Sequence, residues 1–133
     1  PDTSQDIRSL LRLKVERGSA QKANAPGYFV GGLTGSSEKV VNGQYAKDRL
    51  VTSFFGVFPI DAPRYLVMTI VDEPQGVAED RGFKTAAWNA APIAGRIIEQ
   101  VAPLLGVPAR HFDTAGDSKQ NASGIADRSG ILP

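Results

Sequence analysis

The sequence predicts an α+β fold in which an antiparallel sheet is flanked by one helix near each end of the chain. Three observations support this class. An amphipathic pattern covers residues 3–18, three stretches rich in β-branched and aromatic side chains lie within residues 28–71, and a second amphipathic pattern follows residue 89. Short turns separate the three stretches, which favours antiparallel pairing of neighbours. We therefore expect the order helix, strand, strand, strand, helix.

The first expected element is a helix over residues 3–18, with apolar and charged side chains on different faces. Thr3 or Ser4 is a candidate N-cap, and Thr3 with Asp6 approximates a capping box. Gly18 stands where a left-handed residue often ends a helix. The expected buried stripe consists of Ile7, Leu10, Leu11 and Val15.

Three strands are expected over residues 28–41, 50–58 and 64–71. Asn42 and Gly43 form a turn signal after the first strand, and the short run PIDAP allows a hairpin between the second and the third. The third strand is apolar on both faces, so its outer edge would be prone to unwanted pairing if it were open. We expect another chain, a symmetry mate or the C-terminal tail to cover that edge.

A second helix is expected after Asn89, which can cap it, with Pro92 in its first turn and Pro103 bending or ending it. Residues 1–106 are expected to form one unit, followed by a polar tail over residues 107–133 whose composition is typical of a flexible segment. The expected buried stripe of this helix consists of Ile93, Ile97, Ile98 and Val101.

The composition excludes several classes of site. A net charge of +1 over 133 residues gives no reason to expect nucleic acid as a partner. Cysteine is absent and His111 is the one histidine, so we expect no disulfide, no metal and no cofactor. No apolar run approaches the roughly 18 residues that span a bilayer. The chain opens on Pro1 instead of Met, which suggests a piece of a longer protein.

The stretch VGGLTGSSEK, residues 30–39, combines three glycines with three hydroxyl side chains. Glycine weakens the interior of a strand, so Gly31, Gly32 and Gly35 indicate a place where a ligand or another backbone approaches closely. A glycine-rich edge strand or a bulge without a ligand is the alternative. A phosphate-binding loop is disfavoured, because its motif leads into a helix whereas this segment leads into more strand.

This stretch and its neighbours resemble a known family. The runs PGYFVGGLTGSSEKV, LVTSFFGVFPIDAPRYLVMTIVDEPQG and WNAAPIAGRIIEQVAPLLGV are together similar to the C-terminal part of the transpeptidase domain of class B penicillin-binding proteins, the division-type enzymes above all. The resemblance implies a β-lactamase-like fold, binding of β-lactams, and serine acyl transfer that cross-links peptidoglycan stem peptides. It also implies a periplasmic location, with an inner-membrane anchor outside this chain.

The resemblance assigns roles to four residues of the stretch. Thr34 and Gly35 match the Thr and Gly of the family's Lys-Thr-Gly motif, and Ser36 matches the hydroxyl residue that follows. It implies that the backbone N–H of Ser36 completes the oxyanion hole, where one donor is typically worth about 3 kcal/mol of barrier. It also implies that the hydroxyls of Thr34 and Ser36 hold a carboxylate. Leu33 stands where the motif has lysine, so that positive charge is missing.

The family's nucleophile motif, Ser-x-x-Lys, and its Ser-x-Asn motif precede this region. We therefore expect the chain to form one wall of the site, to be inactive alone, and to need the remainder of the domain or another protein chain. Ser19 with Lys22, and Ser36 with Lys39, match Ser-x-x-Lys locally. Both matches are expected to be chance. The first follows a helix stop, and the second falls in a strand, where positions three apart point to opposite faces.

A second hypothesis is a non-catalytic scaffold or binding module that kept the fold, and Leu33 favours it.

Other polar or aromatic candidates are interpreted as structural residues. His111 is expected at the surface, Trp88 is expected to be a packing anchor, and a solvated rim is expected to contain Asp72, Glu73 and Glu79.

Overall fold

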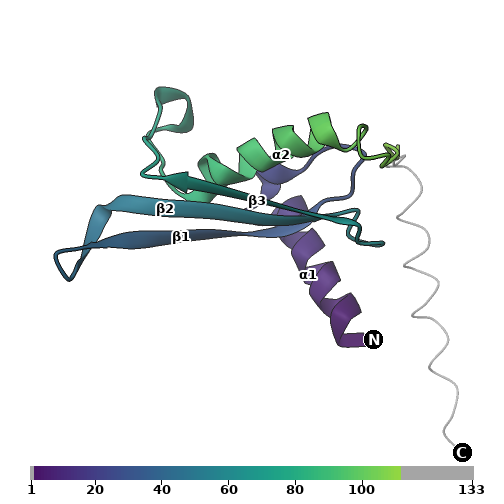
Figure 1. Cartoon of the computed structure of the whole chain (residues 1–133), viewed down its shortest axis with the longest axis horizontal. Helices are drawn as coiled ribbons and strands as arrows, with labels where there is room; N and C mark the ends of the chain where they lie inside the picture. The colour runs from purple at the N-terminus through teal and green to yellow at the C-terminus, as the bar shows by residue number, and fades with distance from the viewer. Residues whose placement is uncertain (1, 112–133) are drawn as a thin grey trace, which may run out of the picture.

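A three-stranded antiparallel sheet and two α-helices make up residues 2–111, the part of the chain that the structure, a computed structural model, describes (Figure 1). This confirms the predicted α+β class and the predicted order of elements. The elements are α1 (Asp2–Arg17), η1 (Gln21–Ala23), β1 (Gly31–Val41), β2 (Gln44–Phe58), β3 (Tyr65–Asp72), η2 (Ala78–Asp80), η3 (Ala86–Trp88) and α2 (Ala90–Val101).

Helix α1 differs from its prediction at the N-terminus and in its buried face. It already includes Asp2, so Thr3 and Ser4 lie inside the helix and the prediction that they cap it is wrong. Val15 is the buried residue of the helix, whereas Ile7 and Leu10 are exposed. The helix packs against β1 and η1, and its N-terminal turns extend away from the sheet (Figure 1). Within residues 2–111, the apolar stripe of α1 is therefore fully buried only towards its C-terminal end.

Gly18 ends α1, but it is not among the described residues with a positive φ, so the predicted left-handed stop is wrong. The carbonyl oxygen of Lys14 accepts hydrogen bonds from the N–H groups of both Gly18 and Ala20, at 3.1 and 3.2 Å. A Cβ atom at position 18 would lie 2.8 Å from that oxygen. Glycine is therefore required here because the chain folds back tightly over the last turn of the helix.

The β1–β2 hairpin turns at Asn42 and Gly43, as predicted. Their φ angles are 52° and 78°, as a type I′ turn requires. Strand β2 begins directly after this turn, earlier than predicted, because its pairing with β1 continues to the tip of the hairpin. The register shifts between Glu38 and Lys39. Strand β1 in turn begins later than predicted, because a φ of 52° at Phe29 interrupts the extended backbone.

Helix α2 packs on one face of the sheet through small residues. Asn89 caps it as predicted, its side chain accepting a hydrogen bond from the N–H of Ala90 at 2.8 Å. Of the predicted stripe only Ile98 is buried; Ile97 is exposed. A Cβ at Gly95 would lie 3.0 Å from the carbonyl oxygen of Lys22, so close approach of the backbones replaces large side chains. The buried residues of α2 are Ala90, Ala91, Ala94, Gly95 and Ile98.

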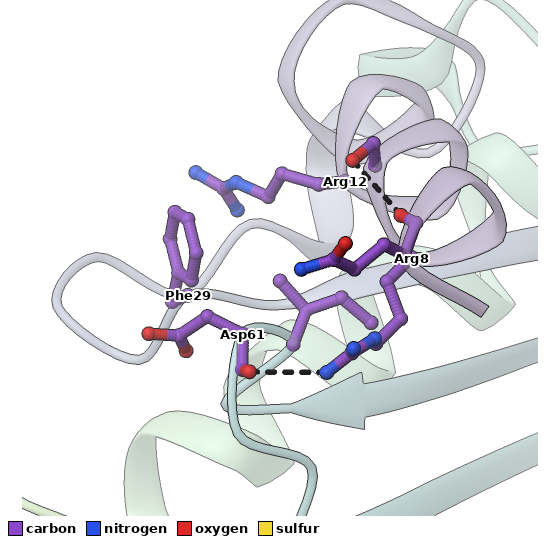
Figure 2. Close-up of a pocket in the computed structure, with 7 residues that line it drawn as sticks. Arg8, Arg12, Phe29 and Asp61 are labelled. Carbon is purple, nitrogen blue, oxygen red and sulfur yellow. Dashed lines mark hydrogen bonds between the residues drawn. The ribbon is translucent and has the colours of Figure 1, made fainter. Parts of the chain in front are cut away.

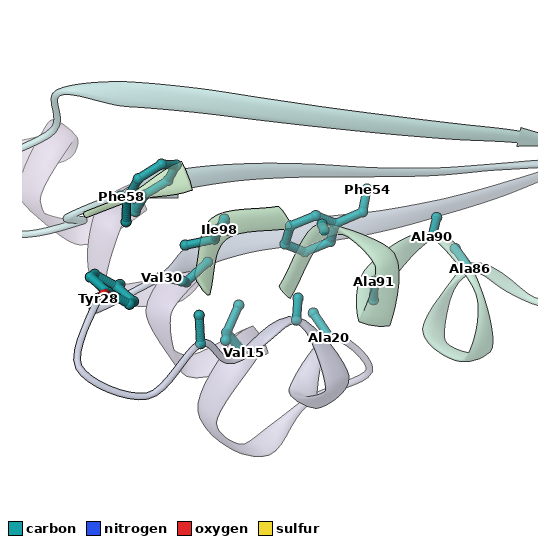
Figure 3. Packing of buried hydrophobic residues seen from close by; sticks show 14 of the residues in the cluster. Val15, Ala20, Tyr28, Val30, Phe54, Phe58, Ala86, Ala90, Ala91 and Ile98 are labelled. Carbon is teal, nitrogen blue, oxygen red and sulfur yellow. The ribbon is translucent and has the colours of Figure 1, made fainter. Parts of the chain in front are cut away.

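The core lies between α2, the sheet and the end of α1 (Figure 3). Phe54 and Phe58 of β2 are its largest buried side chains. Val30, just before β1, and Val15 close it from the side of α1. Because α1, β2, β3 and α2 all contribute, the start of β1 is held on several sides.

The opposite face of the sheet carries apolar side chains that are exposed within residues 2–111. Leu66, Met68 and Ile70 of β3 lie on it, whereas Val67 packs against the core, so β3 is apolar on both faces as predicted. Strand β3 is an edge of the sheet in this part of the chain. The expectation that the tail covers this edge falls on residues outside the described ones.

The chain returns to the start of β1 after α2. Val107 is buried, and the N–H of Arg110 donates to the carbonyl of Gly27 at 2.8 Å. The guanidinium of Arg110 forms two hydrogen bonds of 2.7 Å with the carboxylate of Asp61, and this contact lowers the pKa of that carboxyl. His111 is exposed, as predicted. None of the helices in residues 2–111 is long and apolar enough to cross a bilayer.

Candidate functional site

The stretch that resembles the motif lies on β1, an edge strand of the described sheet. Its residues pair with β2 alone: Thr34 lies opposite Phe54, and Ser36 lies opposite Thr52. Neighbouring side chains of a strand point to opposite faces. Thr34 and Ser36 therefore share the face that α2 covers, whereas Leu33 points to the other face.

Leu33 forms part of an apolar row across the sheet. The register places it opposite Phe55, which in turn lies opposite Met68 of β3. The three side chains are 43%, 40% and 52% exposed. Leucine therefore continues an apolar surface of three strands, and no cation stands at this position of the motif.

The glycines of the stretch make room mainly for the chain's own atoms. A Cβ at Gly32 would clash with the backbone oxygen of Phe55 and would lie 2.5 Å from the ring of Phe54. A Cβ at Gly31 would lie 2.5 Å from the side chain of Ile60. At Gly35, by contrast, the first atom met would be the hydroxyl of Ser53, at 2.8 Å. Gly35 is thus the glycine with the least crowded surroundings of the three.

Thr34 is held by a hydrogen-bond chain that sequence reasoning missed. Its Oγ1 atom lies 3.1 Å from Oγ of Ser19, and Nζ of Lys14 donates to the same Oγ at 3.4 Å. Lys22, the lysine of the local Ser-x-x-Lys match, instead lies over the ring of Trp88, 4.4 Å from its centroid. The prediction that Ser19 and Lys22 form no serine–lysine pair is confirmed. The tight turn after α1 is the one sequence signal that could have revealed the contact.

Ser36 is attached to η3. Its Oγ atom accepts a hydrogen bond from the N–H of Ala86 at 2.9 Å, which leaves its own O–H available as a donor. Lys39 instead donates to the carboxylates of Asp72 and Glu73, at 2.9 and 2.8 Å. The second local Ser-x-x-Lys match therefore also forms no pair, as predicted.

An ion cluster joins the three strands beyond the motif. Glu73 accepts hydrogen bonds from Nε of Arg49, at 2.8 Å, and from Nζ of Lys39. The contacts with Arg49 and then Lys39 lower the pKa of Glu73 to about 2. Hydrogen bonds to Asp72 and Glu73 raise the pKa of Lys39. Asp72 and Glu79 are exposed, as the predicted solvated rim requires, whereas Glu73 is half-buried; Asp72 and Glu73 are in addition ion-paired with Lys39.

A second concave site lies between α1 and the β2–β3 turn (Figure 2). It encloses about 350 Å³, and Arg8, Arg12, Phe29 and Asp61 contribute to its lining. The guanidinium of Arg12 lies 4.6 Å from the ring centroid of Phe29, and Nη1 of Arg8 donates to the backbone oxygen of Asp61 at 3.1 Å. These arginines hold the protein's own backbone and ring. We assign this site no function.

Trp88 is half-buried and stacked on Phe83, with ring centroids 5.1 Å apart, so it anchors η3 only partly.

Within residues 2–111, no group of three or more histidine, cysteine, aspartate or glutamate side chains could hold a metal ion. The polar chemistry of the strand thus consists of hydroxyls, backbone N–H groups and one nearby ammonium. Such a set can bind an anionic or carbonyl oxygen.

Comparison with known proteins identifies the family. The family model for the penicillin binding protein transpeptidase domain matches residues 1–99. The probable peptidoglycan D,D-transpeptidase FtsI of Caulobacter vibrioides is 43% identical over 131 residues, covering 91% of this chain and 22% of the relative. The chain thus spans about a fifth of the length of that relative.

Solved structures agree. The apo transpeptidase domain of penicillin-binding protein 3 from Burkholderia pseudomallei is 30% identical, with a TM-score of 0.71, over 84% of this chain and 33% of that one. Penicillin binding protein 3 from Mycobacterium tuberculosis, complexed with ampicillin, is 26% identical, with a TM-score of 0.70, over 85% of this chain and 26% of that one. The α+β arrangement described above is part of that fold. This chain belongs to the family of penicillin-binding protein transpeptidase domains.

Proposed function

We propose that the chain forms one wall of the acyl-transfer site of a peptidoglycan D,D-transpeptidase, an enzyme that cross-links cell-wall peptides and binds β-lactams. The observation that carries the proposal is the edge strand β1, which presents Thr34, Gly35 and Ser36 beside a sheet of the family's fold. The curated Caulobacter relative is named a D,D-transpeptidase, and the Mycobacterium structure holds ampicillin. Both support this function.

In the proposed mechanism each residue of the wall has one task. The substrate peptide lies along β1 beside Gly35, where no side chain obstructs it. A serine from a segment outside these residues attacks the substrate carbonyl carbon, and the backbone N–H of Ser36 donates to the oxygen on which negative charge develops. The hydroxyls of Thr34 and Ser36 donate to the substrate carboxylate. The N–H acts mainly on the transition state, whereas the hydroxyls act on binding.

We further propose a cell-wall setting for the longer protein, with the domain in the periplasm and a membrane anchor outside this chain. The naming of the Caulobacter relative as a peptidoglycan enzyme supports this setting. The proposed partners are the peptidoglycan stem peptide, β-lactams and the remainder of the transpeptidase domain.

Covalent labelling with a fluorescent penicillin tests the proposal. The full-length protein that carries these residues should become labelled, whereas the 133-residue chain alone should not. Gly35→Val should strongly slow labelling of the full-length protein, because its side chain would occupy the path of the substrate. Ser37→Ala, next to the motif, is the matched control and should leave the rate unchanged.

The scaffold hypothesis remains the second candidate, because Leu33 removes the motif's cation. An unlabelled full-length protein that binds the same penicillin reversibly would support the scaffold and contradict acyl transfer. Labelling of the isolated chain would instead overturn the proposal that the nucleophile comes from another segment.

A further inference from the structure

The motif lacks its strand lysine, yet an ammonium group stands close to the motif threonine. Nζ of Lys14, on the last turn of α1, donates to Oγ of Ser19 at 3.4 Å, and that oxygen lies 3.1 Å from Oγ1 of Thr34. Two contacts therefore connect a cation on a helix to the hydroxyl proposed to bind the substrate carboxylate. Neither the helix periodicity nor the strand motif predicts this connection.

The backbone explains why these side chains meet. The carbonyl of Lys14 accepts hydrogen bonds from the N–H groups of Gly18 and Ala20, so the chain reverses within one turn of the helix end. A side chain at Gly18 would clash with the backbone of Lys14, because a Cβ would lie 2.8 Å from its oxygen. The reversal leaves Ser19 between α1 and β1, within reach of both Lys14 and Thr34.

The chemistry of the groups sets a direction along this chain. An ammonium group can only donate, so Ser19 accepts from Lys14. The O–H of Ser19 can then donate to Thr34, which leaves the O–H of Thr34 free to donate to a ligand. A hydrogen bond from a charged donor polarises the bonds that follow it. The end of this chain is therefore a hydroxyl donor beside a positive charge, suited to a carboxylate.

The surface around Lys14 is compatible with such a ligand. An open hollow of about 680 Å³ lies along this end of α1, lined by Leu10, Leu13, Lys14, Arg17 and Gly18; Ser19 and Thr34 lie outside its lining. The lining combines two positive charges with apolar side chains. A carboxylate attached to an apolar or peptide group would match both kinds of surface.

We infer that Lys14, acting through Ser19, replaces the missing motif lysine as the source of positive charge for a carboxylate bound at Thr34. The inference deepens the proposed function and rests on it for the identity of that carboxylate. Lys14 is a positioning residue: it acts on Thr34 through the hydroxyl of Ser19. The positive charge of the site is then supplied by α1, on the sheet face that Thr34 shares with α2.

Carboxylate preference in the 133-residue chain tests the inference without any acylation step. Backbone amide shifts are followed by NMR during titration with N-acetyl-D-alanyl-D-alanine and with its C-terminal amide, which lacks the negative charge. The wild-type chain should bind the acid about tenfold more tightly than the amide, as expected for one charge-assisted contact. The largest shifts should fall at Thr34 and Ser19.

Substitutions then locate the source of the preference. Lys14→Met should bring the acid and the amide to within about twofold of each other, and Ser19→Ala should do the same with the lysine still present. Lys14→Arg should retain the preference. Lys47→Met removes an exposed lysine from β2 and is the matched control, which should bind like the wild type. A purely structural role for Lys14 would weaken both ligands equally.

Two results would overturn the inference: equal binding of acid and amide by the wild type, or an undiminished preference in Lys14→Met. The proposed function fails on a different measurement. If the full-length protein is not labelled by penicillin while the carboxylate preference disappears in Lys14→Met, the transpeptidase proposal is wrong and the assignment of Lys14 stands.

Discussion

At position 33 a leucine continues an apolar row where the motif carries a charge. The side chain lies beside Phe55 and, being apolar, supplies no charge to a carboxylate. Lysine at this position would restore the motif on β1. The aliphatic part of a lysine side chain can pack on the apolar row while the ammonium group extends beyond that row.

Leu33→Lys should therefore raise the rate of acylation of the full-length protein by penicillin, by about tenfold if one charge-assisted hydrogen bond is gained. Leu33→Met, which adds no charge, is the control and should leave the rate within about twofold. The second-order rate constant with fluorescent penicillin measures both. Lys14 acts only through Ser19, so an ammonium group at position 33 adds to its effect. An unchanged rate in Leu33→Lys would contradict this prediction.

Gly32 and Gly35 differ in what an added methyl group would meet. At Gly32 it would clash with the backbone oxygen of Phe55 and the buried ring of Phe54, neither of which can move freely. At Gly35 it would meet the hydroxyl of Ser53, which can rotate away. Gly32→Ala should lower the free energy of unfolding by about 3 kcal/mol, and Gly35→Ala by less than about 1 kcal/mol. Urea denaturation of the two variants tests this, and equal losses would contradict it.

At the scale of elements, the ion cluster links β1, β2 and the end of β3. Lys39, Arg49 and Glu73 each come from a different segment, and the bulge in the β1–β2 register lies beside them. The cluster is open to solvent, so salt should weaken it. It nevertheless fixes how the hairpin, which extends past β3, sits against the sheet (Figure 1).

The lowered pKa of Glu73 gives a prediction with a definite sign. Because the carboxyl has a pKa of about 2 in the fold against 4.5 ordinarily, its contribution to stability is present above pH 4.5 and disappears as the pH falls towards 2. The Glu73→Gln variant should therefore lose less stability than the wild type as the pH falls from 4.5 to about 2. Thermal unfolding at low salt measures this difference. Glu79→Gln, at an exposed glutamate of η2, should follow the wild type. Parallel curves for all three proteins would contradict the prediction.

Local signals predicted the elements well where the deciding interaction is local. The Asn42–Gly43 turn and the Asn89 cap are set by a few adjacent residues, and both were predicted correctly. The buried face of α2 was not, because small residues such as Ala94 are buried through close backbone approach, which periodicity of large apolar side chains does not reveal. The contact of Lys14 with Ser19, and of Ser19 with Thr34, depends on a tertiary reversal. The site roles of Thr34, Gly35 and Ser36 came from resemblance and stay predictions.

At the scale of the whole molecule, the described fold has one covered and one uncovered sheet face. Helix α2 covers the first. The second carries large exposed side chains, and further apolar side chains of α1 are exposed as well. Neighbouring exposed apolar side chains of this kind mark a site of association. Within residues 2–111 the exposed apolar side chains include Ile7, Leu10, Leu13, Leu33, Phe55, Leu66, Met68 and Ile70.

The isolated 133-residue chain should therefore self-associate. Met68→Lys together with Ile70→Glu places opposite charges on the uncovered face of β3, where both side chains are exposed, and should shift the chain towards monomer. Sedimentation velocity across a concentration series measures the change. As a control, Lys47→Met on the protruding hairpin should not promote dissociation. A wild-type chain that stays monomeric throughout the series would contradict this view of the sheet face.

The return of the chain to Gly27 has a practical consequence for labelling. Residues 107–110 are fastened beside the start of β1 by Val107 and by the paired charges of Arg110 and Asp61. The described residues consequently end near Gly27, and the motif threonine lies further along the strand. A dye or surface tether joined after His111 would start from this corner of the molecule. Immobilisation through that point should leave the exposed edge of β1 available to a soluble peptide.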